Sequence, residues 1–370
     1  MKPVVPELLP LTEIPWEPLI PLMGQANRSL AHYDGLLQAL PNPDVLLSPM
    51  TTQEAVLSSR IEGTQATLGE VLKFEAGEEP KAESRRLDIQ EILNYRRALR
   101  KAETELKRKP FNLNLLLELH DMLLDSVRGR DKARGRFRTT QNWIGRPGAP
   151  IEKAQFIPPT PMAIPRLLDN WEKHYHVEAP DPLVQLAVVH AQFEIIHPFL
   201  DGNGRLGRIL VPLFLYEKEI LSRPMFYLSA YLEEHREQYI SRLRDLSNSP
   251  KRWNAWIAFF LEALDEQAQS NTVKARRILD LYERLKAQVL GLTRSQFAVP
   301  LLDHLFEQPV FQSTDLIGRK GMPSKQMLMS MLDKLKTAGI LKVLREARGR
   351  RAQILAFAEL VNLCEGKKAL

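Results

Sequence analysis

The residues best suited to chemistry lie in one short stretch, Ile196–Arg208, with the sequence IHPFLDGNGRLGR. It combines one histidine, one aspartate, one asparagine, two arginines and three glycines. Apolar segments flank it, residues 183–196 before it and 206–215 after it, and each pattern predicts a helix buried on nearly all faces. Polar groups buried without partners destabilise a fold, so the stretch predicts a ligand-binding loop between two core helices.

The glycines of this loop indicate an anionic ligand. Gly202 and Gly204 flank Asn203 just before the second helix, so a ligand can approach the backbone closely. The first N–H groups of a helix point outward without partners in the helix, and the helix dipole adds positive potential there. Arg205 and Arg208 supply guanidinium donors that fit phosphate oxygens. The loop therefore predicts a phosphate-binding site.

Two other side chains could react or bind a metal beside the phosphate. The imidazole of His197 titrates in the range needed to take a proton from a hydroxyl group. Asp201 offers a carboxylate of the kind that holds Mg²⁺ when the ion bridges protein and substrate phosphates. The loop therefore combines a phosphate site with a candidate metal ligand and a group that can take a proton from a hydroxyl.

The stretch resembles the signature of the Fic family, His-x-Phe-x-Asp/Glu-Gly-Asn-Gly-Arg-x-x-Arg, and matches it at every specified position. Leu206 and Gly207 fill the unspecified positions. The resemblance implies a protein adenylyltransferase, a Mg²⁺-dependent nucleotidyltransferase that moves AMP from ATP to a hydroxyl side chain of a protein. It implies His197 as the general base, Asp201 as the metal ligand, and Asn203 with the neighbouring N–H groups as stabilisers of the charge on phosphate oxygens.

A second motif lies upstream, in a predicted helix over residues 51–62. Ser58-x-x-x-Glu62-Gly63 is similar to the inhibitory motif of the Fic family, Ser/Thr-x-x-x-Glu-Gly/Asn, in the class with an N-terminal inhibitory helix. A glutamate in an arginine-rich phosphate site would pair with an arginine and replace a terminal phosphate. The resemblance implies autoinhibition in which Glu62 pairs with Arg208. A surface glutamate near a helix end is the alternative.

Two further regions are similar to parts of the family's binding site. Tyr239, in a predicted helix over residues 231–246, is similar by position to a tyrosine of the nucleotide base pocket, and a core tyrosine is the alternative. Residues 135–145 and 154–159 predict two short strands that resemble the Fic flap. Its edge would hold a target peptide at Gln155, Phe156 and Ile157, unless the hairpin only covers the core. The nucleotide-binding set that the resemblance implies is Glu62, His197, Gly202, Asn203, Gly204, Arg205, Leu206, Gly207, Arg208 and Tyr239.

Composition sets limits on this interpretation. The 370 residues exceed one ordinary core, and 44% hydrophobic residues indicate a folded, soluble protein of two or three domains. The net charge of +6 would suit acidic partners, but a mixed solvated surface is the better explanation. The single cysteine, Cys364, excludes an intramolecular disulfide and favours the cytoplasm. We expect neither secretion nor a membrane-spanning segment.

The remaining pattern is mainly helical. Six prolines in residues 1–21 predict an extended arm. Periodicity predicts further helices over residues 23–40, 68–74, 84–107, 113–124, 164–175 and 253–290, and Pro212 should bend the helix after the loop. His120 is interpreted as a structural histidine.

The C-terminal pattern differs and resembles a winged helix-turn-helix. Helices are predicted over residues 301–306, 314–317 and 323–338, with strands over 340–344 and 353–357. Ser324, Lys325 and Gln326 begin the candidate recognition helix. A basic turn between the strands, with Arg345, Arg348, Arg350 and Arg351, would suit DNA phosphates, and a module for protein contacts or dimerisation is the alternative.

We therefore predict a mainly α protein with a Fic-type helical core, a β-hairpin flap and a C-terminal winged helix-turn-helix. The expected division is 1–110, an N-terminal helical region with the inhibitory motif; 111–290, the catalytic core; and 291–370, the winged helix. Expected partners are ATP, Mg²⁺ and a protein substrate that includes the chain itself; a homodimer and DNA are further candidates. Two other functions stay open: a nucleotide-sensing DNA-binding regulator, and a de-AMPylase using the same pocket.

Overall fold

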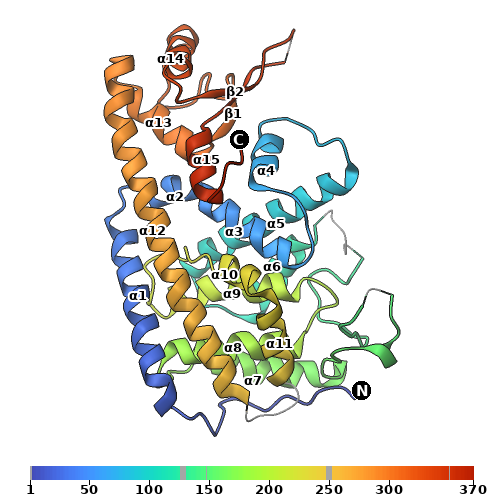
Figure 1. Cartoon of the computed structure of the whole chain (residues 1–370). Helices are drawn as coiled ribbons and strands as arrows, with labels where there is room; N and C mark the ends of the chain where they lie inside the picture. The colour runs from blue at the N-terminus through green and yellow to red at the C-terminus, as the bar shows by residue number, and fades with distance from the viewer. Residues whose placement is uncertain (1, 126–130, 147, 247–251, 350) are drawn as a thin grey trace. The chain divides into compact units, whose positions relative to one another are not determined.

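The computed structural model describes residues 2–125, 131–146, 148–246, 252–349 and 351–370, and it is mainly helical (Figure 1). It forms two compact units. The first contains Met1–Gly35, Leu57–Gly63 and Asn94–Gln269, and the second contains Leu36–Val56, Thr64–Leu93 and Ser270–Leu370. The division of the sequence into three regions at residues 110 and 290 stays a prediction. None of the described helices is long and apolar enough to cross a membrane.

The first unit holds the helices on either side of the predicted loop. Its complete helices are α6 (Leu113–Leu123), α7 (Ile164–His176), α8 (Pro182–Ile196), α9 (Asn203–Glu217), α10 (Ser229–Glu234) and α11 (Arg236–Leu246). It also contains parts of α1 (Ile20–Ala39), α3 (Ser48–Ile61), α5 (Glu83–Leu106) and α12 (Trp253–Thr293), and the 3₁₀ turns η1 (Glu17–Leu19), η2 (Ile151–Lys153) and η3 (Pro161–Ala163).

Helix α8 is the centre of this unit. Thirteen of its 15 residues are buried, as the apolar sequence predicts. It packs against α7 and α9, and α7 and α8 run side by side in Figure 1. The carboxylate of Asp181 caps its start by accepting hydrogen bonds from the N–H groups of Leu183 and Val184. Indole N–H groups of Trp171 and Trp256 bind backbone carbonyls of α8, so the helix is anchored on two sides.

Two predicted helices differ from the structure. The helix predicted over residues 231–246 is divided at His235, where α10 ends and α11 begins. The His235 ring stacks on Tyr231, and its Nδ1 lies 3.0 Å from the Tyr231 carbonyl, which also accepts from the His235 N–H at 2.9 Å. The helix predicted over residues 314–317 is wrong. Those residues form turns, because the Asp315 carboxylate accepts a hydrogen bond from the N–H of Gln312.

The second unit contains a small antiparallel sheet with helices. Its strands are β1 (Val310–Gln312), β2 (Lys342–Arg345) and β3 (Ile354–Ala356), in the order β1-β3-β2. The register pairs Val310 and Lys342 with Ala356 on opposite edges of β3. Its complete helices are α2 (Pro43–Leu46), α4 (Leu68–Glu75), α13 (Ala298–Glu307), α14 (Lys325–Thr337) and α15 (Ala358–Glu365). Neither β1 nor α15 is in the sequence prediction, and the winged-helix interpretation stays a prediction.

Candidate active site

The loop between α8 and α9 reverses the chain within the core. It begins at His197, in the left-handed region at φ 48°, and it ends at Gly202, at φ 81°. Glycine adopts such a φ readily, whereas histidine does so only when its surroundings hold it. The loop therefore places an imidazole at the C-terminal end of α8 and the first N–H groups of α9 at its other end.

Buried side chains hold the backbone of this loop. The guanidinium of Arg138 donates to the His197 carbonyl at 2.9 Å, and Arg138 is 2% exposed. The Asn203 amide accepts from the N–H of Phe199 and donates to its carbonyl, both at 2.9 Å. The side-chain amide of Asn203 therefore closes the loop and is not available to a ligand. The backbone N–H of Asn203, in the first turn of α9, can still donate to an anion. Sequence reasoning did not identify Arg138.

His197 is set to accept a proton. Burial lowers the pKa of its imidazole to about 4, although a hydrogen bond to the Glu194 backbone works in the opposite direction. The ring is therefore neutral at pH 7. A neutral imidazole can act as a general base without first losing a proton.

Arg208 is bound by the upstream motif. Its Nε donates to the Ser58 hydroxyl at 2.8 Å, and its Nη2 donates to the Ser58 carbonyl at 3.0 Å and to Oε1 of Glu62 at 2.6 Å. Burial tends to raise the pKa of Glu62, but the charge and hydrogen bond of Arg208 outweigh it and lower that pKa. A Cβ added at Gly204 would collide with Oε1 of Glu62. The carboxylate therefore lies at the N-terminus of α9, where the sequence predicts a phosphate.

A cavity of about 250 Å³ opens beside this ion pair. One part of its wall is apolar, formed by Ile144, Ile240 and Leu243. The cavity brings together seven of the predicted site residues: Glu62, Gln155, Phe156, His197, Gly204, Arg208 and Tyr239. Of the other predicted residues, Ser58 binds Arg208, Gly63 follows Glu62 at φ 105°, and Leu206 is buried.

Tyr239 is linked to α9 through His190, which sequence reasoning missed. The Tyr239 hydroxyl lies 2.9 Å from Nε2 of His190, whose Nδ1 lies 3.1 Å from the Gly207 carbonyl. Burial lowers the pKa of His190 to about 3, so the ring is neutral. Because a carbonyl only accepts, Nδ1 donates to Gly207 and Nε2 accepts from Tyr239.

Glu194 is a second missed residue in the cavity wall. Burial raises the pKa of its carboxyl to about 7, the nearby Glu62 carboxylate adds to this, and Arg208 opposes it. Among the described residues, its Oε1 has no hydrogen-bond partner. A Cβ at Gly207 would collide with that oxygen, so the glycine makes room for it. His190, Glu194 and His197 follow each other at helical spacing in an apolar helix, which is the signal that could have found them.

Asp201 stands at the open side of the loop. Its Oδ1 accepts from the N–H of Gly202 at 2.6 Å and from Arg205 at 3.3 Å, and its side chain is 42% exposed. Within the described part of the chain, no group of three or more His, Cys, Asp or Glu side chains could hold a metal ion.

The predicted flap pairs at a single antiparallel bridge, between Ile144 and Phe156. The N–H of Ile144 donates to the Phe156 carbonyl at 2.9 Å, and prolines, which cannot donate, stand at 150, 158 and 159. Gln155 accepts a hydrogen bond from Arg244 of α11 at 3.0 Å. The Ile157 carbonyl accepts from the N–H of Val4 at 2.9 Å, so the N-terminal arm pairs where a target peptide is predicted to bind.

The fold and site define a class of helical protein with an anion-binding loop between two core helices. The family model described as Fic/DOC family N-terminal matches residues 20–104, and the Fic/DOC family model matches residues 110–215, together about half of the chain. The chain belongs to the Fic/DOC family.

Relatives and solved structures agree with this assignment. The chain is 38% identical over 95 residues to a probable protein adenylyltransferase of Aquifex aeolicus, covering 25% of this chain and 27% of that protein. It is 29% identical over 162 residues to protein adenylyltransferase fic-1 of Caenorhabditis elegans, covering 42% of this chain and 30% of that protein. The chain thus spans less than a third of these curated relatives.

The structural neighbours show the fold. A Fic family protein from Desulfovibrio desulfuricans G20 gives a TM-score of 0.58 at 19% identity and covers 96% of this chain and 98% of its own. A Fic domain containing signaling protein from Bacteroides thetaiotaomicron gives 0.55 at 20% identity, covering 69% of this chain and 96% of its own. The predicted Fic-type helical core is confirmed.

Replacing Glu194 with glutamine should change the pH dependence of stability. Folding raises the pKa of this carboxyl from 4.5 to about 7. Between these values the unfolded chain loses the proton and the folded chain keeps it, so native stability falls as pH rises and then levels off. Glu194→Gln removes that loss. We expect it to be more stable than the wild type by about 3 kcal/mol at pH 8, with the difference vanishing below about pH 4.5.

Thermal unfolding of both proteins across this pH range measures the effect. Glu237→Gln, at an exposed glutamate of α11, is the control and should show no such trend. A stability difference for Glu194→Gln that does not vary with pH would contradict the buried, protonated carboxyl.

Proposed function

We propose that this chain is a protein adenylyltransferase that transfers AMP from ATP to a hydroxyl side chain of a protein, and that Glu62 inhibits it. The observation that carries the proposal is the position of the Glu62 carboxylate, bound to Arg208 and lying against Gly204 at the start of α9. An anion already occupies the anion site, beside the neutral imidazole of His197. The names of the adenylyltransferase relatives support the reaction class.

The chemistry follows from the groups in the cavity. His197 takes the proton of the target hydroxyl, and the hydroxyl oxygen bonds to the α-phosphorus of ATP. The bond from that phosphorus to the oxygen leading to the β-phosphate breaks, and pyrophosphate leaves with the electron pair. N–H groups at the start of α9, with Arg205 and Arg208, stabilise the negative charge on the phosphate oxygens. Tyr239 and the apolar part of the cavity wall are suited to bind the adenine ring of ATP.

The residues around Asp201 fit a magnesium ion that arrives with the nucleotide. The carboxylate is partly exposed, and no cluster of further metal-binding side chains surrounds it in the described residues. Mg²⁺ is commonly held in this way, by one or two carboxylates together with substrate phosphates and water. When bound, it would neutralise charge on the phosphates, and Asp201 would hold it.

Inhibition follows from competition for Arg208. The guanidinium of Arg208 donates through Nη2 to Glu62 and through Nε to the Ser58 hydroxyl. A terminal phosphate would need the same donors and the same space beside Gly204. Glu62 therefore disfavours the pose of ATP that places its α-phosphate near His197.

Replacing His197 with alanine should abolish label transfer from α-labelled ATP to protein. Loss of a general base lowers a rate by about 10² to 10⁴, which brings transfer to background. ATP affinity, measured by calorimetry, should change little, because the phosphate donors remain. Transfer at the wild-type rate would contradict the general-base role.

Replacing Glu62 with glycine should raise auto-modification by at least about tenfold, since the lost charge-assisted hydrogen bond is worth on the order of 1.5–3 kcal/mol. Mass spectrometry after incubation with ATP and Mg²⁺ measures the added AMP. Glu62→Gln, which keeps the shape without the charge, should give an intermediate rise. An unchanged or lower rate in Glu62→Gly argues against inhibition by Glu62. Removal of AMP from an already modified protein would instead favour the reverse reaction.

A second candidate function concerns the second unit alone. Ser324, Lys325 and Gln326 are exposed at the start of α14, and Arg348 pairs with Arg351 in the exposed turn between β2 and β3. This arrangement suits DNA phosphates and base edges, as a winged helix would. Arg350, also predicted there, lies outside the described residues.

Binding to duplex DNA at 50 and 200 mM salt tests this candidate. We expect salt-sensitive binding that weakens in Arg348→Gln/Arg351→Gln, with each lost phosphate contact reducing the slope of log K against log salt by about 0.9. Lys367→Gln/Lys368→Gln, at two exposed residues near the C-terminus, removes the same two charges and is the matched control. Salt-independent binding, or none, would leave the region a protein-contact module.

A further inference from the structure

His120 of α6 holds the anion loop from the side opposite the cavity. Its Nε2 lies 3.0 Å from the Asp201 carbonyl, and its ring stacks on Phe199 with centroids 3.8 Å apart and planes at 15°. A Cβ added at Gly202 would lie 3.5 Å from its Cδ2. One imidazole thus contacts three residues of the loop, although the sequence suggests only a structural histidine.

The hydrogen bonds fix the tautomer of this ring. The Asp201 carbonyl can only accept, so Nε2 must carry a hydrogen. The N–H of Gly135 donates to Nδ1 at 2.9 Å, so Nδ1 must be free of hydrogen. His120 therefore accepts a hydrogen bond from Gly135 and donates one to the anion loop.

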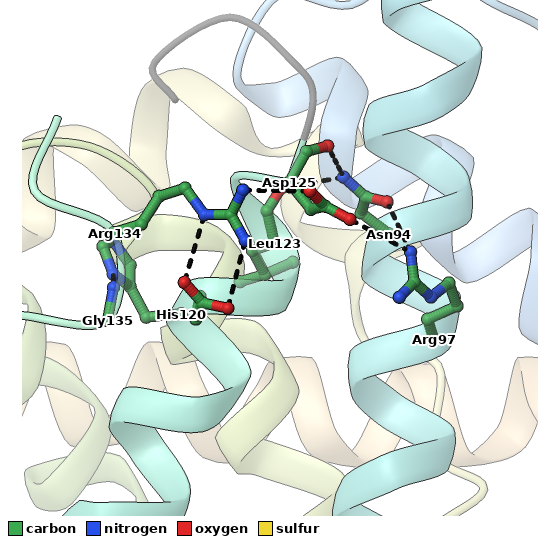
Figure 2. Close-up of polar contacts among 8 residues, drawn as sticks. Asn94, Arg97, His120, Leu123, Asp125, Arg134 and Gly135 are labelled. Carbon is green, nitrogen blue, oxygen red and sulfur yellow. Dashed lines mark hydrogen bonds and ion pairs between the residues drawn. The ribbon is translucent and has the colours of Figure 1, made fainter. Parts of the chain in front are cut away.

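Gly135 is itself fixed by a polar cluster next to it in the chain (Figure 2). The guanidinium of Arg134 binds both carboxylate oxygens of Asp121, at 3.0 and 3.1 Å, and Oδ1 of Asp125 at 2.9 Å. The side chain of Asn94 in α5 donates to the Asp125 carbonyl at 2.7 Å. Helices α5 and α6 therefore support the donor that orients His120.

The hydrogen bond from His120 to the Asp201 carbonyl orients the Asp201–Gly202 peptide unit. The carbonyl of the Asp201–Gly202 peptide points to His120, and the N–H of the same peptide donates to Oδ1 of Asp201 at 2.6 Å. Rotation of this peptide would break both bonds and move the Asp201 carboxylate together with the start of α9. The orientation of the proposed metal ligand and of the first N–H groups of α9 thus depends on a donor at Nε2.

We propose that His120 is a positioning residue for AMP transfer, acting through the Asp201–Gly202 peptide; this rests on the proposed function. The alternative is a residue that only fills the core. The two roles differ in what they require of the side chain. Positioning needs a donor at the place of Nε2, whereas packing needs only a side chain of suitable size.

Two amides separate these roles. In His120→Gln, the amide nitrogen reaches the place of Nε2 and can still donate to Asp201. In His120→Asn, the amide oxygen replaces Nδ1 and can still accept from Gly135, but no donor reaches Asp201. We expect His120→Asn to lower kcat for auto-modification at least about tenfold and His120→Gln to lower it less than about threefold, with similar melting temperatures.

The measurement uses the full chain with Glu62→Gly in every protein, with kcat and KM for ATP measured separately. Equal losses of kcat in the two amide variants would overturn the positioning role. If the Glu62→Gly parent transfers no AMP, the proposed function fails. The inference is then tested by calorimetric affinity for ATP with Mg²⁺, which should weaken in His120→Asn and not in His120→Gln, and equal affinities would overturn it.

A surface variant gives a test that does not alter the core, in case the amide variants fail to fold. Arg134→Met removes the cluster that fixes Gly135, and we expect a three- to tenfold lower kcat with a smaller change in KM. The neighbouring Arg136→Met, at an exposed arginine, is the matched control and should leave kcat unchanged. Equal rates in Arg134→Met and Arg136→Met would contradict the connection through Gly135.

Discussion

The site depends on one buried cation. The side chain of Arg208 is 1% exposed and that of its partner Glu62 is 39% exposed, so loss of Glu62 would leave a buried guanidinium charge uncompensated and destabilise the fold. The chain supplies the anion from α3, through Glu62, and the neutral acceptors from Ser58. A phosphate is the other anion that fits beside Gly204. The structure therefore favours a site that always contains an anion, either from the protein or from the nucleotide.

A carboxylate and a phosphate can replace each other beside Arg208 only if the anion loop keeps its shape. The backbone of this loop is held at every second residue from His197 to Asp201. Arg138 binds the carbonyl of His197, Asn203 binds both backbone groups of Phe199, and His120 binds the carbonyl of Asp201. Each bond satisfies a backbone group of the loop. The same bonds orient the imidazole and the first N–H groups of α9 before any ligand arrives.

The sequence predicted the parts of this site that depend on local spacing. The loop between two apolar helices follows from residues a few positions apart, and the Ser58 and Glu62 motif was assigned through its resemblance to the inhibitory motif of the family. Arg138 could not be assigned in this way, because its role comes from partners brought together only by the fold. The helical spacing of His190, Glu194 and His197 could have placed them on one face of α8, but their partners also come only from the fold. The break between α10 and α11 at His235 likewise left no signal in the periodicity of the sequence. Strand β1 has only three residues and too little pattern to be recognised.

Glu194 shows how the charges of the site are linked. Its carboxyl gains a higher pKa from burial and from the Glu62 carboxylate, and Arg208 opposes both. If Glu62 leaves Arg208, one of the anions that raise this pKa is lost, so Glu194 ionises more readily and compensates the buried guanidinium. If a phosphate then binds Arg208, its negative charge raises the pKa of Glu194 again, and Glu194 takes up a proton. Exchange of Glu62 for a nucleotide phosphate, as proposed above, would therefore be coupled to the protonation of Glu194 on α8.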